Sequence, residues 1–131
     1  MEINVKINIT RETLECIFVT ALEGGSNHWY FINEETHRFI RSYIPKEEER
    51  CLSLALFSFV YDLDIPIAIH DIEDPEGDPI GYLNRSRFEQ RLQRCYDNQP
   101  WAIHNEINDE GDAESSDIIF QYLVLGDYTY C

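Results

Sequence analysis

Residues 51–61 read CLSLALFSFVY and form the longest apolar stretch of the chain. The stretch carries serines and is too short to cross a bilayer, so it predicts a buried helix. Pro45 can stand near the start of this helix, and the three glutamates at 47–49 suit its positive N-terminal end. Because apolar residues lie on every side of it, the helix over residues 46–62 is expected to be the central one of the core.

Upstream of this stretch, the sequence predicts a strand and then a helix. Apolar and polar residues alternate over residues 2–9, which is typical of a half-buried strand. Thr10 can cap a helix over residues 11–23, whose apolar residues recur on one face. Gly24 follows the last of them, so we expect it to end the helix in the left-handed conformation.

The other expected elements are shorter, and they complete a small α+β domain. Residues 118–125 (IIFQYLVL) would also suit a buried strand, but a capping residue before them and a glycine after them favour a helix. The expected elements are a helix capped by Asn33 over 34–43, strands over 65–71 and 79–83, a helix over 85–96, a helix opening at Pro100, a helix from Asp112 to about Leu125 that Gly126 ends, and a strand over 127–131.

These elements predict one α+β domain over residues 1–131. A small, largely antiparallel sheet would form from 2–9, 65–71, 79–83 and the C-terminal strand, packed by several helices. The length fits a single domain, and the chain is 44% hydrophobic, which is enough for a core. The start of the chain lacks the apolar region of a signal peptide, and the four cysteines are scattered singly, so we expect reduced thiols and a cytoplasmic protein.

Net charge is the most unusual property of the composition. The chain has 25 acidic and 10 basic residues, which gives a formal charge of −15. Such a charge argues against direct binding to nucleic acid or to an anionic membrane surface. It favours a basic partner, a cation or simple solubility.

Residues 21–32 (ALEGGSNHWYFI) admit two interpretations. In the first, a helix ends at the glycines and the aromatic residues turn back into the core. In the second, Asn27, His28 and Trp29 lie at the edge of a pocket for a small ligand. The glycines match neither G-x-G-x-x-G nor a P-loop, and they follow a helix instead of opening one, which favours the first interpretation.

No motif of catalysis or of metal binding stands out. The four histidines lack the spacing of zinc ligands, and no G-x-S-x-G turn is present. The acidic stretch DIEDPEGDP lacks the glutamate of a calcium loop, so a solvated turn is favoured over a weak cation site. We therefore expect no enzyme activity, no catalytic residue, no metal and no cofactor.

Charges are segregated along the chain. Residues 62–84 hold seven acids, residues 97–131 hold eight, and neither segment contains Lys or Arg. Between them, residues 85–96 carry four arginines and one glutamate. One interpretation is a soluble acidic protein whose basic helix packs against its own acidic turns. The other is a surface of carboxylates that imitates the phosphates of DNA or RNA and occupies a groove lined by Lys and Arg.

The blocks ALEGGSNHWY and GDAESSDIIFQYLVLGDYTY, with a strand–turn–GYL–helix unit between them, are similar to those of a family of small uncharacterised bacteriophage and prophage proteins. That family carries an ALEGGSNYWY-like block and a C-terminal DAETAD-like block, and His28 stands where it often has Tyr. The resemblance covers most of the chain. It implies a phage or prophage origin and action in the bacterial cytoplasm, and it brings no activity with it.

Together, charge and resemblance predict a non-enzymatic inhibitor of a basic, nucleic-acid-binding bacterial defence factor, such as a CRISPR effector or a restriction enzyme. The alternatives are a ligand-binding protein with the pocket described above, and a structural or regulatory phage protein. The residues expected to touch the partner lie in the two acidic turns: Asp74, Glu76, Asp78, Asp109, Glu110 and Glu114.

Overall fold

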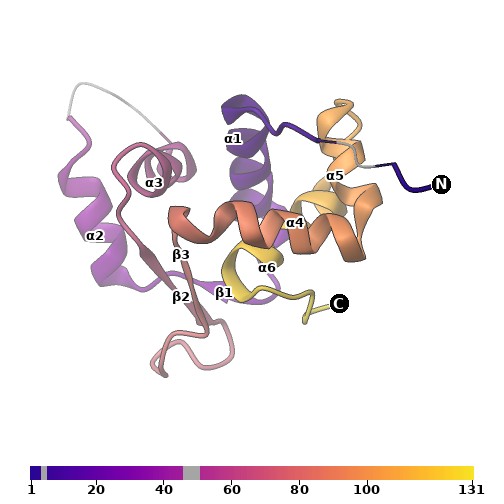
Figure 1. Ribbon diagram of the computed structural model, residues 1–131. Coiled ribbons are helices and arrows are strands. Elements are labelled where there is room, and N and C mark those ends of the chain that lie inside the picture. Colours follow the sequence, from indigo (N-terminus) through magenta and orange to yellow (C-terminus); the bar gives the residue numbers. More distant parts are fainter. Residues whose placement is uncertain (4–5, 46–50) are drawn as a thin grey trace.

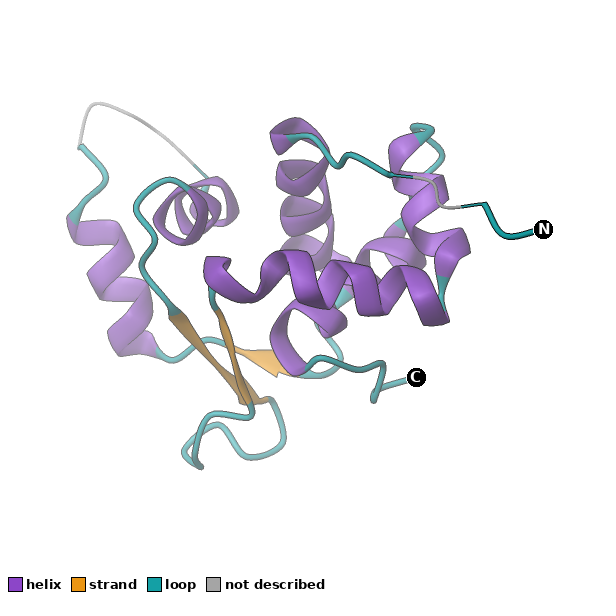
Figure 2. Cartoon of the chain, in the orientation of Figure 1, coloured by secondary structure: helices purple, strands orange, loops and turns teal. Residues whose placement is uncertain are grey.

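The computed structural model describes residues 1–3, 6–45 and 51–131, and these form an α+β fold (Figures 1 and 2). The fold class is therefore the expected one. In chain order the elements are α1 (Arg11–Thr20), the π-helical turn η1 (Ala21–Gly25), β1 (Tyr30–Phe31), α2 (Glu34–Ser42), α3 (Leu52–Tyr61), β2 (Ile67–Asp71), β3 (Gly81–Leu83), the 3₁₀ turn η2 (Arg85–Arg87), α4 (Phe88–Asn98), α5 (Pro100–Ile107) and α6 (Ala113–Leu125).

The central helix is α6, and the prediction that residues 46–62 hold this place was wrong. Every residue from Ser115 to Val124 is buried, and α6 packs against α1, α4, α5 and β3. Helix α3 packs against α1 and α2 at one side of the molecule (Figure 1). Its described part begins at Leu52, and residues 46–50 of the predicted helix lie outside the described residues.

Helix ends follow the local signals in the sequence. The side chains of Thr10, Asn33 and Asp112 each accept a hydrogen bond from the backbone N–H three residues on, at 3.2, 2.9 and 2.9 Å. Each bond satisfies one of the N–H groups that a helix leaves free at its start. Pro100 opens α5, and Gly126 ends α6 with φ 77°, the left-handed conformation that glycine adopts most easily.

The prediction for Gly24 was wrong, because α1 does not end there. It continues into η1, where the Ser26 N–H donates to the Ala21 carbonyl at 2.9 Å, and Gly24 does not have a positive φ. Of this pair of glycines, Gly25 is the one that the fold needs, since a Cβ there would lie 2.7 Å from the Ala113 carbonyl oxygen. Gly25 thus lets η1 approach the start of α6.

The sheet is antiparallel, with the strand order β1-β2-β3. Strands β2 and β3 form the predicted hairpin, with Ile67 opposite Leu83 (Figure 2). The third strand is β1, where Tyr30 pairs with Asp71. The predictions of a strand at each end of the chain were both wrong, because the described residues of 2–9 and residues 127–131 form no strand. Alternating apolar residues give a segment a face to bury, but they do not supply a strand to pair with.

Candidate functional site

All six acidic residues expected to touch a partner are exposed. Asp74, Glu76 and Asp78 lie in the turn between β2 and β3, residues 72–80, which we call the acidic turn (Figure 2). A carboxylate oxygen of Asp71 accepts the Glu73 N–H at 2.9 Å and shapes the start of this turn. The other three residues, 109, 110 and 114, lie in the loop between α5 and α6 and in the first turn of α6.

Few acids of the two acidic segments of the chain are paired with a cation. Within the described ranges, ion pairs reach the segments 62–84 and 97–131 at only two acids, Asp62 with Arg11 and Asp117 with His28. The remaining ion pairs join Arg11 to Glu15 and two arginines of α2 to Glu34. The six carboxylates of the two predicted contact regions are therefore exposed and make no ion pair with a cation of the described residues.

Two arginines of residues 85–96 bind helix ends instead of acidic turns. Arg85 donates to the Tyr61 carbonyl at 2.8 Å, at the end of α3, and its guanidinium lies over the Tyr61 ring. Arg91 donates to the carbonyls of Leu123 and Val124, in the last turn of α6. Such carbonyls have no partner within their own helix, and the C-terminal end of a helix favours positive charge. These two arginines thus bind helix ends and not the carboxylates of the acidic turn.

The turn at residues 26–29 is fixed by one buried carboxylate, Asp117 of α6. The Ser26 hydroxyl and the Trp29 indole N–H both donate to its Oδ1, each at 2.7 Å. The Gln121 amide donates to Oδ2 at 3.0 Å, and Nε2 of His28 lies 3.8 Å from the same oxygen. The first and last blocks of the chain therefore meet at Asp117, which is 6% exposed.

The C-terminal strip, residues 127–131, covers this network. The side-chain oxygen of Gln121 accepts the N–H groups of Thr129 and Tyr130 at 3.0 and 2.8 Å, and its NH₂ donates to the Tyr130 carbonyl at 2.7 Å. The Tyr130 ring stacks on Trp29 with ring centroids 5.4 Å apart. The sequence predicted that this segment would be a strand, bonded to a neighbouring strand. The Gln121 side chain makes hydrogen bonds to its backbone instead.

Burial and nearby groups raise the pKa of two tyrosines of the C-terminal strip. For Tyr128 the groups that contribute after burial are Cys131, Asp117 and Glu114. Burial likewise raises the pKa of Tyr130, with contributions from Asp71 and Glu73 beside the hairpin.

Two residues of types that serve in nucleophilic catalysis, Ser26 and Cys95, are buried. Ser26 is fully buried, and its hydroxyl donates to Asp117 instead of to His28. Burial raises the pKa of Cys95 to about 12, so its thiol stays protonated and unreactive. Across the part of the chain that the structure describes, no group of three or more His, Cys, Asp or Glu residues could hold a metal ion. The helices described include none that is both long and apolar enough to span a membrane.

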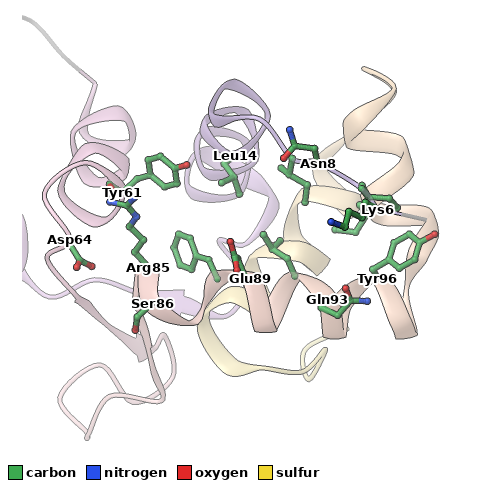
Figure 3. A pocket seen from close by; sticks show the side chains of 15 residues that line it. Lys6, Asn8, Leu14, Tyr61, Asp64, Arg85, Ser86, Glu89, Gln93 and Tyr96 are labelled. Carbon is green, nitrogen blue, oxygen red and sulfur yellow. Dashed lines mark hydrogen bonds between the residues drawn. The ribbon is translucent and has the colours of Figure 1, made fainter. Parts of the chain in front are cut away.

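Two cavities lie away from the turn at residues 26–29. A groove of about 1000 Å³ lies between the N-terminal segment, α1 and α4, and Figure 3 shows polar and apolar side chains along it. A smaller cavity of about 140 Å³ is lined by Glu23, Tyr30 and His37, among others, and burial lowers the pKa of His37. Asn27, His28 and Trp29 line neither cavity, and Trp29 is only 1% exposed.

Asp117 and Gln121 were not foreseen as key residues. The signal for them is their spacing: two polar residues one helical turn apart in the apolar run DIIFQYLVL. On a buried helix, such a pair needs hydrogen-bond partners from other parts of the chain. Comparisons of the chain with protein-family models, with curated proteins and with solved structures found no match.

Proposed function

We propose that this chain is an acidic phage or prophage protein that inhibits a bacterial nucleic-acid-binding defence factor of the CRISPR-effector or restriction type. It acts without catalysis, in the bacterial cytoplasm, by binding the protein surface that normally holds DNA or RNA. Its exposed carboxylates take the place of phosphates.

The observation that carries this proposal is that the carboxylates of the two contact regions are not paired with positive charges of the described residues. The residues 74, 76, 78, 109, 110 and 114 are exposed and make no ion pair with a described cation. Lys and Arg side chains that bind phosphates would gain from meeting them, and such charge attraction speeds association. The Asp117 network supports the proposal further, because it fixes the start of α6 against the turn at residues 26–29, and Glu114 lies in the first turn of α6. Pre-ordered charges lose less conformational entropy on binding.

The ligand-binding alternative has less support. It needs Trp29 at the edge of an open pocket, but the indole is buried against Tyr130 and donates its N–H to Asp117. No contact among the described residues specifically supports a structural or regulatory role in a phage.

Competition with nucleic acid tests the proposal. The chain is first used to capture binding proteins from bacterial lysate at low and at high salt, and each captured nucleic-acid-binding protein is purified. Fluorescence anisotropy then follows labelled DNA or RNA bound to that protein as the chain is added. We expect displacement at low salt that weakens steeply as salt rises, because salt screens charges over about 10 Å at 0.1 M. Displacement that salt does not change would contradict the mimicry, and simultaneous binding of chain and nucleic acid would contradict competition.

A further inference from the structure

The cavity of about 140 Å³ lies where η1, the β1 segment, α2 and α3 meet. Half of its lining residues are apolar, namely Leu22, Ile32, Leu52 and Leu56, and the other half can form hydrogen bonds, namely Glu23, Tyr30, His37 and Ser53. A cavity of about 150 Å³ can hold benzene, so this one has room for a ligand of about that size.

The hydroxyl groups that line the cavity have already used their protons. The Ser53 hydroxyl donates to Oε1 of Glu23 at 2.9 Å, and the Tyr30 hydroxyl donates to the Leu22 carbonyl at 2.5 Å. A hydroxyl has one proton to donate, so toward a ligand both oxygens can only accept. An ionised carboxylate likewise has acceptors alone.

The carboxylate of Glu23 is the charged group of this cavity. It makes no ion pair with a cation of the described residues. Burial raises the pKa of Tyr30, and the charge of Glu23 adds to the effect, which places the carboxylate near the phenol. Burial lowers the pKa of His37, so at neutral pH its ring is uncharged and offers one further acceptor nitrogen beside one N–H. The cavity therefore has a surplus of acceptors and one negative charge.

We propose that this cavity binds a primary ammonium group carried by a short alkyl chain or a small ring. Such a group has a positive charge and three N–H donors, which match the carboxylate of Glu23 and the acceptors of Tyr30 and His37. Its apolar part would contact the leucine and isoleucine side chains of the lining. An anion would be repelled by Glu23, and a neutral alcohol has one donor in place of three. This inference does not rest on the proposed function.

Titration of the ¹⁵N-labelled chain, followed by nuclear magnetic resonance, tests the site with two probes of nearly the same shape. Butylamine is a cation at neutral pH, and 1-butanol is its uncharged counterpart. We expect butylamine to shift the backbone amides of the eight lining residues and to bind about tenfold more tightly than 1-butanol. Equal affinities would overturn the proposal. So would shifts confined to the acidic segments, because the net charge of −15 would then attract the cation without a specific site.

A pair of variants separates the site from general attraction of cations. Glu23→Gln keeps an oxygen that can accept the Ser53 hydroxyl but removes the charge, so the affinity for butylamine should fall about tenfold. Glu12→Gln removes the same charge from an exposed position of α1 and should leave the affinity unchanged. Equal affinities of the two variants would overturn the proposal, and the shifts of the unmodified chain decide the matter if Glu23→Gln does not fold.

A primary ammonium group can belong to a free amine or to a lysine side chain of another protein. Lysine capped at both ends as acetyl-lysine methylamide is the probe that distinguishes these sources. Binding as tight as that of butylamine would support a lysine side chain, and much weaker binding would support a small free amine. Binding of neither probe would overturn the proposal.

Discussion

A methyl group added at Gly25 would lie 2.7 Å from the carbonyl oxygen of Ala113, whereas one added at Gly24 would meet nothing within 4 Å. Gly25→Ala should therefore destabilise the fold by about 1–3 kcal/mol, the range typical of overpacking. Gly24→Ala should be neutral or stabilise it by up to about 1 kcal/mol, because alanine restricts the unfolded chain. Urea unfolding of both variants measures this difference. Equal losses of stability would show that η1 does not approach α6 as described.

The Asp117 carboxylate is the second position where one residue decides the local structure. Asp117→Asn would replace one acceptor oxygen by an NH₂ group, which would face either the Gln121 amide or the donors of Ser26 and Trp29. A buried donor left without an acceptor costs about 1–3 kcal/mol, and the free energy of unfolding should fall by that amount. Asp109→Asn is the matched control, because this residue is exposed and its φ of 58° suits asparagine. Equal urea midpoints for the two variants would contradict the role of Asp117.

At the scale of elements, α4 stabilises α6 through the bonds of Arg91 to its last carbonyls. Hydrogen bonds from charged groups contribute about 1.5–3 kcal/mol, so Arg91→Met should lower the free energy of unfolding by roughly that amount. Arg87→Met removes the same charge from an exposed neighbour and should change stability by less than about 0.5 kcal/mol. Thermal unfolding of the pair provides the comparison, and a loss of similar size in Arg87→Met would attribute the effect to charge alone.

Elements governed by nearby residues could be predicted from the sequence, and elements governed by distant ones could not. The caps at Thr10, Asn33 and Asp112 and the β2–β3 hairpin depend on residues close along the chain. The terminal segments needed a pairing strand, which alternation cannot reveal. Likewise, the sequence alone does not show which of two apolar helices lies at the centre of the core. Only the three-dimensional structure shows that it is α6 and not α3.

The same distinction applies to the candidate site. Turn residues predicted that the six acids would be exposed, because Asp, Gly and Pro favour solvent-facing turns. The bonds of Asp117 to Ser26 and Trp29 join residues 91 and 88 positions apart, so the spacing of Asp117 and Gln121 indicates that they need partners but not which residues supply them.

For the whole molecule, the distribution of charge matters more than its total. A net charge of −15 would favour solubility in any arrangement. In this fold Arg85 and Arg91 bind helix ends, and the six carboxylates of the two contact regions are exposed. Negative charge is thereby left exposed in the acidic turn and around the start of α6, which the proposed replacement of nucleic acid requires.

Charge-matched variants test this central claim most directly. Two carry neutral residues at the expected contacts, namely Asp74→Asn, Glu76→Gln and Asp78→Asn in one, and Asp109→Asn, Glu110→Gln and Glu114→Gln in the other. A control variant carries Glu12→Gln, Glu35→Gln and Glu89→Gln, which remove the same charge from exposed positions of α1, α2 and α4.

The measurement is the concentration of each variant that displaces half of the labelled nucleic acid from the purified partner, at low and at high salt. We predict that each contact variant needs about tenfold more protein than the unmodified chain at low salt, with a weaker dependence on salt, because it has lost charges that attract the partner. The control variant should stay close to the unmodified chain. Equal potency of all three variants would contradict the account, since the acidic turns would then contribute only their share of the net charge.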